Sequence, residues 1–333
     1  KVKYMKKLDL INFYVRGIKI PLFLIFFIFS KLNADENIIF PFENKIYSFD
    51  TNKQKFNILF ASENLFLKDF YIKDNEYFFI EKESDIIKLV SLNSKNRLNK
   101  IFEGEYSNII IAKGYFLTFS KYINKNGFEF SIFKLDSKEK IYSFNLDFLL
   151  SDYEVKDNLI FLAGSDTRDF KNYLFIIDCG SKKILKILEE KKNGDFLKIV
   201  IDKEFIYVYN SSMPAKNNNK YIYKINLLNY NNKDRYNFDI KNKICYFYGK
   251  GFSFNNEIFL PLIDEQYNIT LFSIDKNFKR KRSICLETGL YKIIKKSDNY
   301  IYFIGYNYFK DKTKFYFCYF YPNEDKITYL KIN

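Results

Sequence analysis

The sequence predicts an all-β protein made of seven similar units, each a sheet of four short antiparallel strands. A strand that ends in a polar turn recurs along the chain, as "FSIDKNFK" at 272–279 and in near-copies at 47–54, 90–97, 133–140, 175–182, 223–230 and 318–325. A second pattern, a turn that opens an aromatic strand, recurs in step with it, at Asn75, Gly114, Asn158, Glu204, Asn256 and Asn299. Two patterns that keep the same order and period indicate internal repetition.

The period of the repeat identifies the architecture. The polar residue of the first pattern falls at Asp50, Asn93, Asp136, Asp178, Asn226, Asp275 and, in a degraded copy, Tyr321, at intervals of 42 to 49 residues. Units of about 40 to 50 residues with several short strands are typical of propeller blades. We therefore expect a seven-bladed β-propeller of four-stranded antiparallel blades over residues 35–333, after an N-terminal signal or anchor segment.

The unit around Asp136 shows how each blade is expected to form. Its four strands are predicted at 108–113, 115–122, 128–135 and 141–146. Polar turns such as "NKNG" and "DSKEK" separate the strands, as hairpins require. The Asp or Asn that ends each third strand is expected to accept hydrogen bonds from backbone N–H groups of the following turn.

The chain shows no long amphipathic pattern and no Pro/Gly/Ser linker that would divide the body. We therefore expect one propeller domain, residues 35–333, preceded by residues 1–34. In that first segment a basic region begins with "MKK" at 5–7, followed by the apolar run Ile20–Phe29 and a short polar stretch that ends at Ala34. This order is typical of a secretory signal cut after Ala34, so a periplasmic or otherwise exported protein is expected.

Two other interpretations of the first 34 residues stay open. Leu32, at the third position before the cut, is bulky, which leaves an uncleaved membrane anchor open. "ADENIIFPF" also resembles "KDNEYFFIE" at 73–81, where an apolar strand comes just before the turn. The run 20–29 would then be the inner strand of the first blade, and the protein would be cytoplasmic.

Composition excludes several kinds of chemistry. The chain has no histidine, which rules out Ser–His and Cys–His nucleophile pairs, an imidazole base and His-ligated metals. Residues 1–34 carry +6 of the net charge of +14, and the +8 of the remaining chain is not concentrated in the patch that nucleic-acid binding would require. The four cysteines, Cys179, Cys245, Cys285 and Cys318, have no CxxC spacing, which argues against a zinc site. Export would permit disulfides, but we expect buried free thiols that fill strand positions. We expect no metal and no cofactor.

The pieces "FSIDKNFK", "FKLDSKEK" and "FIIDCGSKK" resemble the seven-bladed propeller superfamily with quinoprotein-like and WD40-like repeats. Quinone-cofactor enzymes of this type stack the cofactor on tryptophan, and the chain has none, so the resemblance does not imply that activity. Exported non-enzymatic members include the propeller component of the outer-membrane assembly machinery. That component is usually a lipoprotein, whereas the nearest cysteine to the predicted cut is Cys179.

The connections between second and third strands are the candidate binding surface, because propeller loops of this kind gather on one face. They are mixed in charge and rich in Asn and Tyr, which suits hydrogen bonding to sugars, peptides or protein surfaces. The candidate binding residues are Asp166, Arg168, Asp169, Asn210, Asn217, Asp264, Glu265 and Tyr308. A basic patch, Lys279, Arg280, Lys281 and Arg282, is predicted in a turn on the opposite face, where it is either solvated or an anchor for polyanions.

The sequence predicts a non-catalytic binding or scaffold propeller of the bacterial cell envelope. Its expected partner is another protein or an envelope polymer and not nucleic acid; membrane contact is expected only through the N-terminal segment, and the protein is expected to be monomeric. The enzymatic alternative is an exported hydrolase or lyase that uses Asp166, Asp169 and Asp264 as acid–base groups or calcium ligands. The third alternative is a cytoplasmic protein-interaction propeller.

Overall fold

The computed structural model describes residues 13–15, 18–20, 37–61, 66–73, 76–83, 86–92, 98–106, 108–119, 128–146, 149–166, 171–191, 196–211, 221–237, 245–264, 266, 268–296, 299–309 and 312–332. These residues belong to two compact units, Lys1–Asp69 and Phe70–Asn333. They form strands joined by turns and irregular connections, as the all-β expectation required. In the part of the chain so described, there is no helix of the length and hydrophobicity that crossing a membrane requires.

The first unit contains the first blade. A short hairpin of β1 (Phe13–Val15) and β2 (Ile18–Ile20) precedes a three-stranded antiparallel sheet of β3 (Asn37–Phe42), β4 (Lys45–Asp50) and β5 (Lys55–Ala61). Since β4 ends at the repeat residue Asp50, these are the second, third and fourth strands of a blade. Apart from Ile20, the predicted apolar run to Phe29 and the cut after Ala34 lie outside the described residues.

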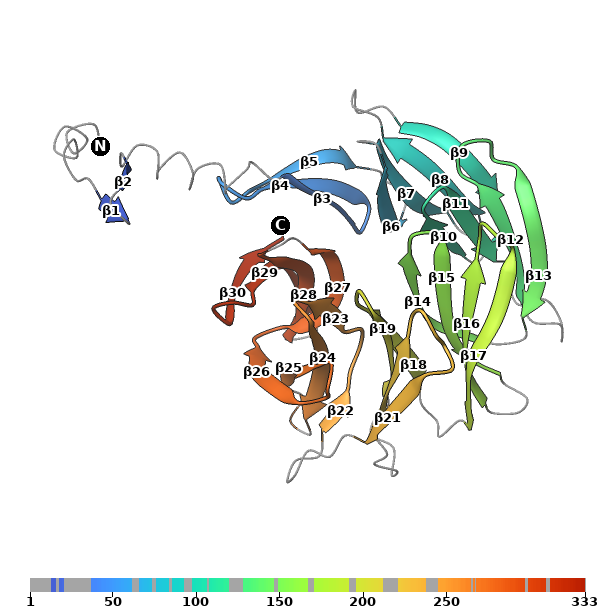
Figure 1. Ribbon diagram of the computed structural model, residues 1–333. Helices are drawn as coiled ribbons and strands as arrows, with labels where there is room; N and C mark the ends of the chain where they lie inside the picture. The colour runs from blue at the N-terminus through green and yellow to red at the C-terminus, as the bar shows by residue number, and fades with distance from the viewer. Residues whose placement is uncertain are drawn as a thin grey trace. The chain divides into compact units, whose positions relative to one another are not determined.

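Six further sheets make up the second unit, apart from the first residues of β6, and follow one another in chain order (Figure 1). Blade 2 contains β6 (Phe66–Lys73), β7 (Glu76–Glu83), β8 (Ile86–Leu92) and β9 (Leu98–Gly104). Blade 3 contains β10 (Asn108–Ala112), β11 (Tyr115–Phe119), β12 (Phe128–Lys134) and β13 (Lys140–Leu146). Blade 4 contains β14 (Leu149–Lys156), β15 (Leu159–Ser165), β16 (Lys171–Asp178) and β17 (Lys183–Lys191).

The last three blades repeat the arrangement with one variation. Blade 5 contains β18 (Phe196–Ile201), β19 (Phe205–Ser211), β20 (Tyr221–Asn226) and β21 (Lys233–Asn237). In blade 6 the first strand is broken into β22 (Cys245–Phe247) and β23 (Phe252–Phe254), which both pair with β24 (Glu257–Asp264), followed by β25 (Ile269–Asp275) and β26 (Arg280–Leu286). Blade 7 contains β27 (Gly289–Lys296), β28 (Ile301–Phe309), β29 (Lys312–Tyr321) and β30 (Lys326–Lys331).

The fold is therefore an all-β propeller with seven blades, as the period predicts. The four strands predicted around Asp136 correspond to β10–β13, and the last three residues predicted for the second strand, 120–122, lie outside the described residues. One prediction about position is wrong. Arg280, Lys281 and Arg282 were expected in the turn between the third and fourth strands of their blade, but they open the fourth strand, β26, and only Lys279 lies in the turn.

The predicted role of the polar residue after the third strand is confirmed in four repeats. Asp50 Oδ1 accepts the backbone N–H groups of Asn52 and Lys53, each at 3.0 Å. Asp178 makes the same pair of bonds to Gly180 and Ser181, as Asn226 does to Leu228 and Asn229, whereas Asp275 accepts from Asn277 and from Lys279, four residues on. Asn93 lies outside the described residues.

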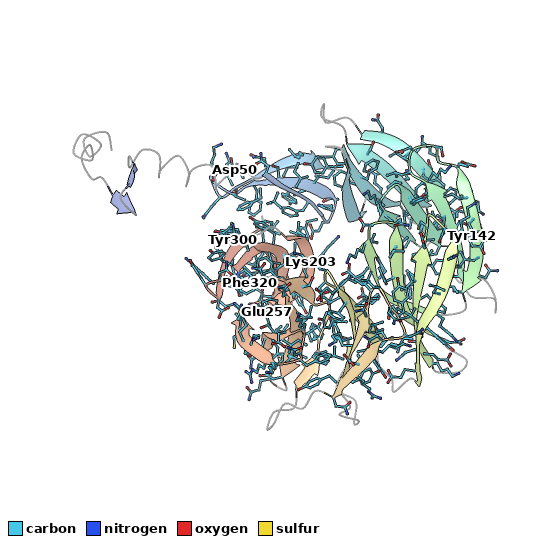
Figure 2. The ribbon with its side chains drawn as sticks, in the orientation of Figure 1. Asp50, Tyr142, Lys203, Glu257, Tyr300 and Phe320 are labelled. Atoms are coloured by element: carbon cyan, nitrogen blue, oxygen red, sulfur yellow. The ribbon has the colours of Figure 1, made fainter. Side chains whose placement is uncertain are left out.

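The core of the second unit lies between consecutive blades. Each pair of neighbouring blades from 2 to 7 shares one cluster of buried apolar side chains, and these side chains fill the space between the sheets (Figure 2). The first strands of blades 3 to 6 contact each other in succession, β10 with β14, β14 with β18, and β18 with β23. Each of blades 3 to 6 thus presents one face to the blade before it and the other to the blade after it.

Candidate functional site

The candidate site is a row of polar side chains on the face of blade 4 that packs against blade 5. Ser165 is the last residue of β15, Asn172 is the second residue of β16, and Glu190 is near the end of β17. The strand register pairs Ser165 with Asn172 and Asn172 with Glu190, so the three side chains lie side by side on one face. We call these three residues the polar row. Ser165 Oγ donates to Asn172 Oδ1 at 2.9 Å.

Blade 5 meets the polar row with an aromatic and basic surface. Tyr223 OH donates to Glu190 Oε1 at 2.9 Å, and Arg235 Nη1 lies 3.7 Å from the same oxygen. The Arg235 guanidinium lies over the rings of Tyr221 and Tyr223, at 4.6 and 5.6 Å from their centroids. Burial, and next the hydrogen bond to Glu190, raise the pKa of Tyr223 to about 12, which keeps its hydroxyl protonated as a donor.

Two atoms of the polar row are buried and have no hydrogen-bond partner among the described residues: Asn172 Nδ2, a donor, and Glu190 Oε2, an acceptor. Asn172 is 0% exposed and the Glu190 side chain is 13% exposed. Since the two residues are cross-strand neighbours, an unsatisfied donor and an unsatisfied acceptor lie on the same short segment of the interface. A buried polar atom without a partner costs about 1–3 kcal/mol, so this arrangement needs an explanation.

The equivalent positions of blades 3 and 6 are apolar. In blade 6, counting back from Asp275 as from Asp178, the row consists of Ile263, Ile269 and Leu286, which pair in the same way and pack against blade 7. Blade 3 is aligned by strand register, since Lys134 pairs with Tyr115 as Asp178 pairs with Leu159. The counterparts of Asn172 and Glu190 are then Phe128 and Leu146, which pair with each other and pack against blade 4. Apolar side chains therefore suit this position in blades 3 and 6, and blade 4 differs because it has polar side chains there.

Two of the predicted binding residues lie in blades 4 and 5, the blades on either side of the polar row's interface. Asp166 follows Ser165 directly and is 7% exposed, and its backbone N–H donates to Lys171 O at 2.9 Å. Asn210 of β19 is 2% exposed, and its Oδ1 accepts the backbone N–H of Tyr221 at 3.3 Å. Both lie at the end of their blades where the second strand stops and the third begins.

The other predicted binding residues do not join this group in the described part of the chain. Asp264 ends β24 in blade 6, where its Oδ1 accepts the backbone N–H groups of Gln266 and Asn268 at 2.9 and 2.8 Å. Tyr308 lies in β28 of blade 7. Arg168, Asp169, Asn217 and Glu265 lie outside the described residues.

The predicted basic patch is largely paired with acidic and aromatic groups. Arg282 donates to both carboxylate oxygens of Glu257, at 3.0 and 2.7 Å, and reaches Asp325 of blade 7 at 2.8 Å (Glu257 is labelled in Figure 2). Lys281 Nζ lies 3.3 Å from Asp275 Oδ2. Arg280 lies over the Phe272 ring at 5.1 Å. Arg282 therefore connects blades 6 and 7, and Lys279 and Lys281 are the exposed lysines of the run.

A second polar cluster joins blades 4, 5 and 6. Lys250, in the break between β22 and β23, places its Nζ 3.2 Å from Asp152 Oδ1 and 3.1 Å from Glu154 Oε1, and also donates to Tyr153 O. Asp152 Oδ2 accepts the backbone N–H of Ile199 in blade 5 at 2.9 Å. The carboxylates of Glu154 and Asp152 raise the pKa of Lys250 although burial, the largest influence, lowers it. All three protons of the ammonium have acceptors, so we interpret this cluster as structural.

In the described residues no group of three or more Asp, Glu, Cys and His side chains is placed to hold a metal ion. Cys179 and Cys318 are buried free thiols, as predicted, and burial raises the pKa of each to about 12. Cys285 is also free but exposed on β26, which corrects the expectation that it is buried. Cys245 lies in β22.

No protein-family model matches the sequence, and no curated protein matches it. Solved structures share the fold. A structure of prolyl endopeptidases has a TM-score of 0.64 at 10% identity, over 96% of this chain and 58% of that chain. An oligogalacturonate lyase from Vibrio parahaemolyticus has a TM-score of 0.63 at 10% identity, over 88% and 84%. Sqt1 from Saccharomyces cerevisiae has a TM-score of 0.53 at 8% identity, over 87% and 78%.

The chain thus spans less than two thirds of the length of the prolyl endopeptidase chain. At these identities the likeness establishes the fold class, a β-propeller, and nothing about chemistry.

Proposed function

We propose that this chain is a non-catalytic binding or scaffold propeller of the bacterial cell envelope, and that it holds its ligand at the blade 4–5 interface. The observation that carries the proposal is the polar row. Its unsatisfied donor and acceptor occupy a position that is apolar in blades 3 and 6. Binding is expected where unpaired polar groups replace apolar packing, because local departures from the usual packing of a fold are found mainly at functional sites.

The mechanism is rigid presentation. The polar row lies on strands whose neighbouring residues are fixed by the shared apolar cluster of blades 4 and 5. Lys250 adds ion pairs that tie blade 6 to blade 4. A ligand that docks there orders little protein, so the entropy cost of binding is small.

Sedimentation with purified cell-envelope polymers tests the proposal. The full chain is expected to co-sediment with an envelope polymer, whereas a variant with Asn172→Leu and Glu190→Leu is expected to remain in the supernatant. Lys279→Ala serves as the matched control, because Lys279 is exposed and distant in sequence from the row. Equal sedimentation of the wild type and the double variant contradicts the proposed site.

The enzymatic alternative is favoured by one observation, the likeness to an oligogalacturonate lyase of which this chain covers 84%. Its proposed carboxylates, Asp166 and Asp264, come from blades 4 and 6, and Asp264 is engaged by its own turn. Incubation with oligogalacturonates, followed by mass spectrometry, is expected to show no cleavage. Cleavage that is lost in Asp166→Asn would replace the binding proposal with this alternative.

The location in the cell depends on residues 1–34. N-terminal sequencing of the protein isolated from its source cells is expected to begin at Asp35, as export requires. A chain that retains residues 20–29 and is found in the cytoplasm would favour the third alternative, a cytoplasmic protein-interaction propeller.

A further inference from the structure

We infer that blades 4 to 6 dock on a bilayer surface that carries anionic phospholipids, through the end of the blades where the turns after the first and third strands lie. We call this the turn end. The inference goes beyond the proposed function and does not use the polar row. It starts from Leu228, which lies in the turn between β20 and β21. Leu228 is 97% exposed, the largest exposed fraction of any large hydrophobic side chain in the described residues.

The turn of blade 5 is ordered and holds Leu228 outward. Asn226 Oδ1 accepts the backbone N–H groups of Leu228 and Asn229, at 2.8 and 3.1 Å. Leu227 and Tyr230, on either side, pack against the apolar cluster shared by blades 4 and 5. The neighbours of Leu228 are thus tied to the core while Leu228 itself faces solvent, although burial in an apolar phase would be favourable for it.

The neighbouring turn, in blade 6, adds apolar surface at the turn end. Phe278 has a φ of 61°, a left-handed conformation that is costly for a bulky residue. Its half-buried ring stacks on Tyr236 of blade 5, with centroids 4.8 Å apart, and Tyr236 is 37% exposed. In the turns of blades 1, 3, 4 and 7 the residue with this conformation is polar: Gln54, Lys138, Lys182 and Asp325.

Exposed lysines lie beside the blade 5 turn. Within blade 5, Leu227 N–H donates at 2.9 Å to the carbonyl of the residue that follows Lys203, which is exposed (Lys203 is labelled in Figure 2). On the blade 6 side, Lys224 Nζ donates at 3.1 Å to the carbonyl of Lys276, whose own side chain is exposed. These hydrogen bonds place both turns next to the turn that carries the exposed leucine.

The blade 4 side of the turn end is also basic. The turn 178–183 contains the exposed residues Lys182 and Lys183. Burial, and next the Asp178 carboxylate of this turn, raise the pKa of Tyr230, because a nearby negative charge disfavours the tyrosinate. Tyr230 therefore lies close to the blade 4 turn, and the blade 5 turn has lysines on both sides.

The charge and the apolar side chains together fit an anionic bilayer. Asp178, Asp202 and Asp275 are half-buried and accept backbone N–H groups of their own turns, whereas Glu204 is exposed. The exposed lysines of these turns outnumber this acid: Lys182, Lys183, Lys203 and Lys276. Lysines pair with anionic headgroups, and apolar side chains between them enter the acyl boundary. A polysaccharide would use the lysines but leave Leu228 in water.

The variant Leu228→Trp tests the inference, because the chain has no tryptophan of its own. The full chain is mixed with vesicles of three parts phosphatidylcholine to one part phosphatidylglycerol. The indole emission is expected to shift to shorter wavelength and to be quenched by brominated acyl chains. Leu149→Trp is the matched control. Leu149 is 42% exposed and begins β14 at the opposite end of blade 4, so neither change is expected there.

Lysine variants of Leu228→Trp test the charge. One lysine near an anionic surface contributes about fivefold in affinity, so Lys182→Ala, Lys203→Ala and Lys276→Ala together are expected to weaken docking by about a hundredfold. Lys331→Ala is the control and is expected to change nothing, since Lys331 ends β30 away from the turn end. Vesicles of phosphatidylcholine alone are expected to leave the emission unchanged.

Three results would overturn the inference. If the chain sediments with anionic vesicles but the emission of Leu228→Trp does not shift, the membrane contact lies elsewhere, as in residues 1–34. An equal shift in Leu149→Trp or on neutral vesicles excludes docking by the charged turn end. A shift that appears with an envelope protein and not with lipid makes the turn end a protein-docking surface. None of these results bears on the polar row, which its own sedimentation experiment tests.

Discussion

At the scale of single residues, the repeat is held by a side chain that closes a turn. Asp50 and Asp178 accept the backbone N–H groups two and three residues on, as Asn226 does with a neutral amide, and Asp275 accepts those two and four residues on. The turn therefore requires a short side chain with an oxygen acceptor, and the negative charge of an aspartate is not needed for these hydrogen bonds. The Ser181 hydroxyl, which donates to Asp178 at 2.7 Å, is the largest influence that holds the pKa of this carboxyl below its usual value.

Replacement of Asp178 separates the geometry from the charge. Asp178→Ala is expected to lower the free energy of unfolding by about 1–2 kcal/mol, because two turn N–H groups lose their acceptor. Asp178→Asn keeps an oxygen at that position, as Asn226 does, and is expected to cost less. Chemical denaturation at pH 7 measures both, and an alanine variant as stable as the wild type would contradict the role.

The same carboxyl gives a pH dependence with a definite sign. Because its pKa is lowered in the folded state, the contribution of Asp178 is present above the pKa of the unfolded chain and is lost as pH falls through the folded pKa. The stability difference between wild type and Asp178→Asn is therefore expected to shrink between about pH 5 and pH 3. A difference that stays constant over this range would show that the charge is irrelevant.

At the scale of elements, the break in the first strand of blade 6 positions Lys250. Gly249 has a φ of 82°, a conformation that favours glycine, and a Cβ on Gly251 would lie 2.4 Å from Phe259 O. The Tyr209 hydroxyl joins the two sides of the break, since it donates to Gly249 O at 2.9 Å and accepts from Gly251 N–H at 2.6 Å. This detour brings Lys250 to Asp152 and Glu154 of blade 4.

Removal of the Lys250 ammonium tests this interpretation. Lys250→Met keeps the apolar stem but leaves two carboxylates without their cation, and we expect a loss of about 1–3 kcal/mol, reduced from a fully buried pair because the lysine is partly exposed. Adding Asp152→Asn and Glu154→Gln to that variant is expected to recover part of the loss. If the triple variant is less stable than Lys250→Met, the ion pairs of Lys250 are not the reason for the break between β22 and β23.

The bond between blades 6 and 7 depends on geometry as well as charge. Arg282 makes two parallel bonds to Glu257, which lysine cannot reproduce, so Arg282→Lys is expected to cost about 1 kcal/mol or more. The neighbouring pair of Lys281 and Asp275 is exposed on the lysine side, so Lys281→Ala is expected to change stability by less than about 0.5 kcal/mol. Thermal unfolding of both variants checks the contrast, and equal effects would contradict it.

At the scale of the whole molecule, the sequence predicted the blades because the same local rules act seven times. Turn residues and alternating strands depend on neighbours in sequence, so the strands of blade 3 and the turn role of Asp178 could be predicted. Contacts between blades are made by residues that are far apart in sequence. The partners of Lys250 and Arg282 therefore could not be predicted. The placement of Arg280–Arg282 was wrong because the polar turn is shorter than the charge pattern suggested.

The polar row was missed although the sequence held a sign of it. Asn172 and Glu190 stand where blades 3 and 6 have Phe128, Leu146, Ile269 and Leu286, and an alignment of the repeats by strand register would have exposed the difference. Loop composition alone pointed to Asp166, the residue after Ser165, and to Asn210 in blade 5. Loop composition indicates which surface could bind a ligand, whereas strand register shows which buried residues, here Asn172 and Glu190, lie next to each other.

The central claim is that the polar row is kept for a ligand and not for the fold. The direct test is the unfolding free energy of the variant with Asn172→Leu, Glu190→Leu, Ser165→Ala and Tyr223→Phe, measured by chemical denaturation without ligand. The last two changes remove the hydroxyl groups that would otherwise lose their acceptors. Replacing the whole row and its partner with apolar side chains, as blade 6 has, is expected to leave stability unchanged or to raise it. A loss of more than about 2 kcal/mol would show that the row is structural and would contradict the account.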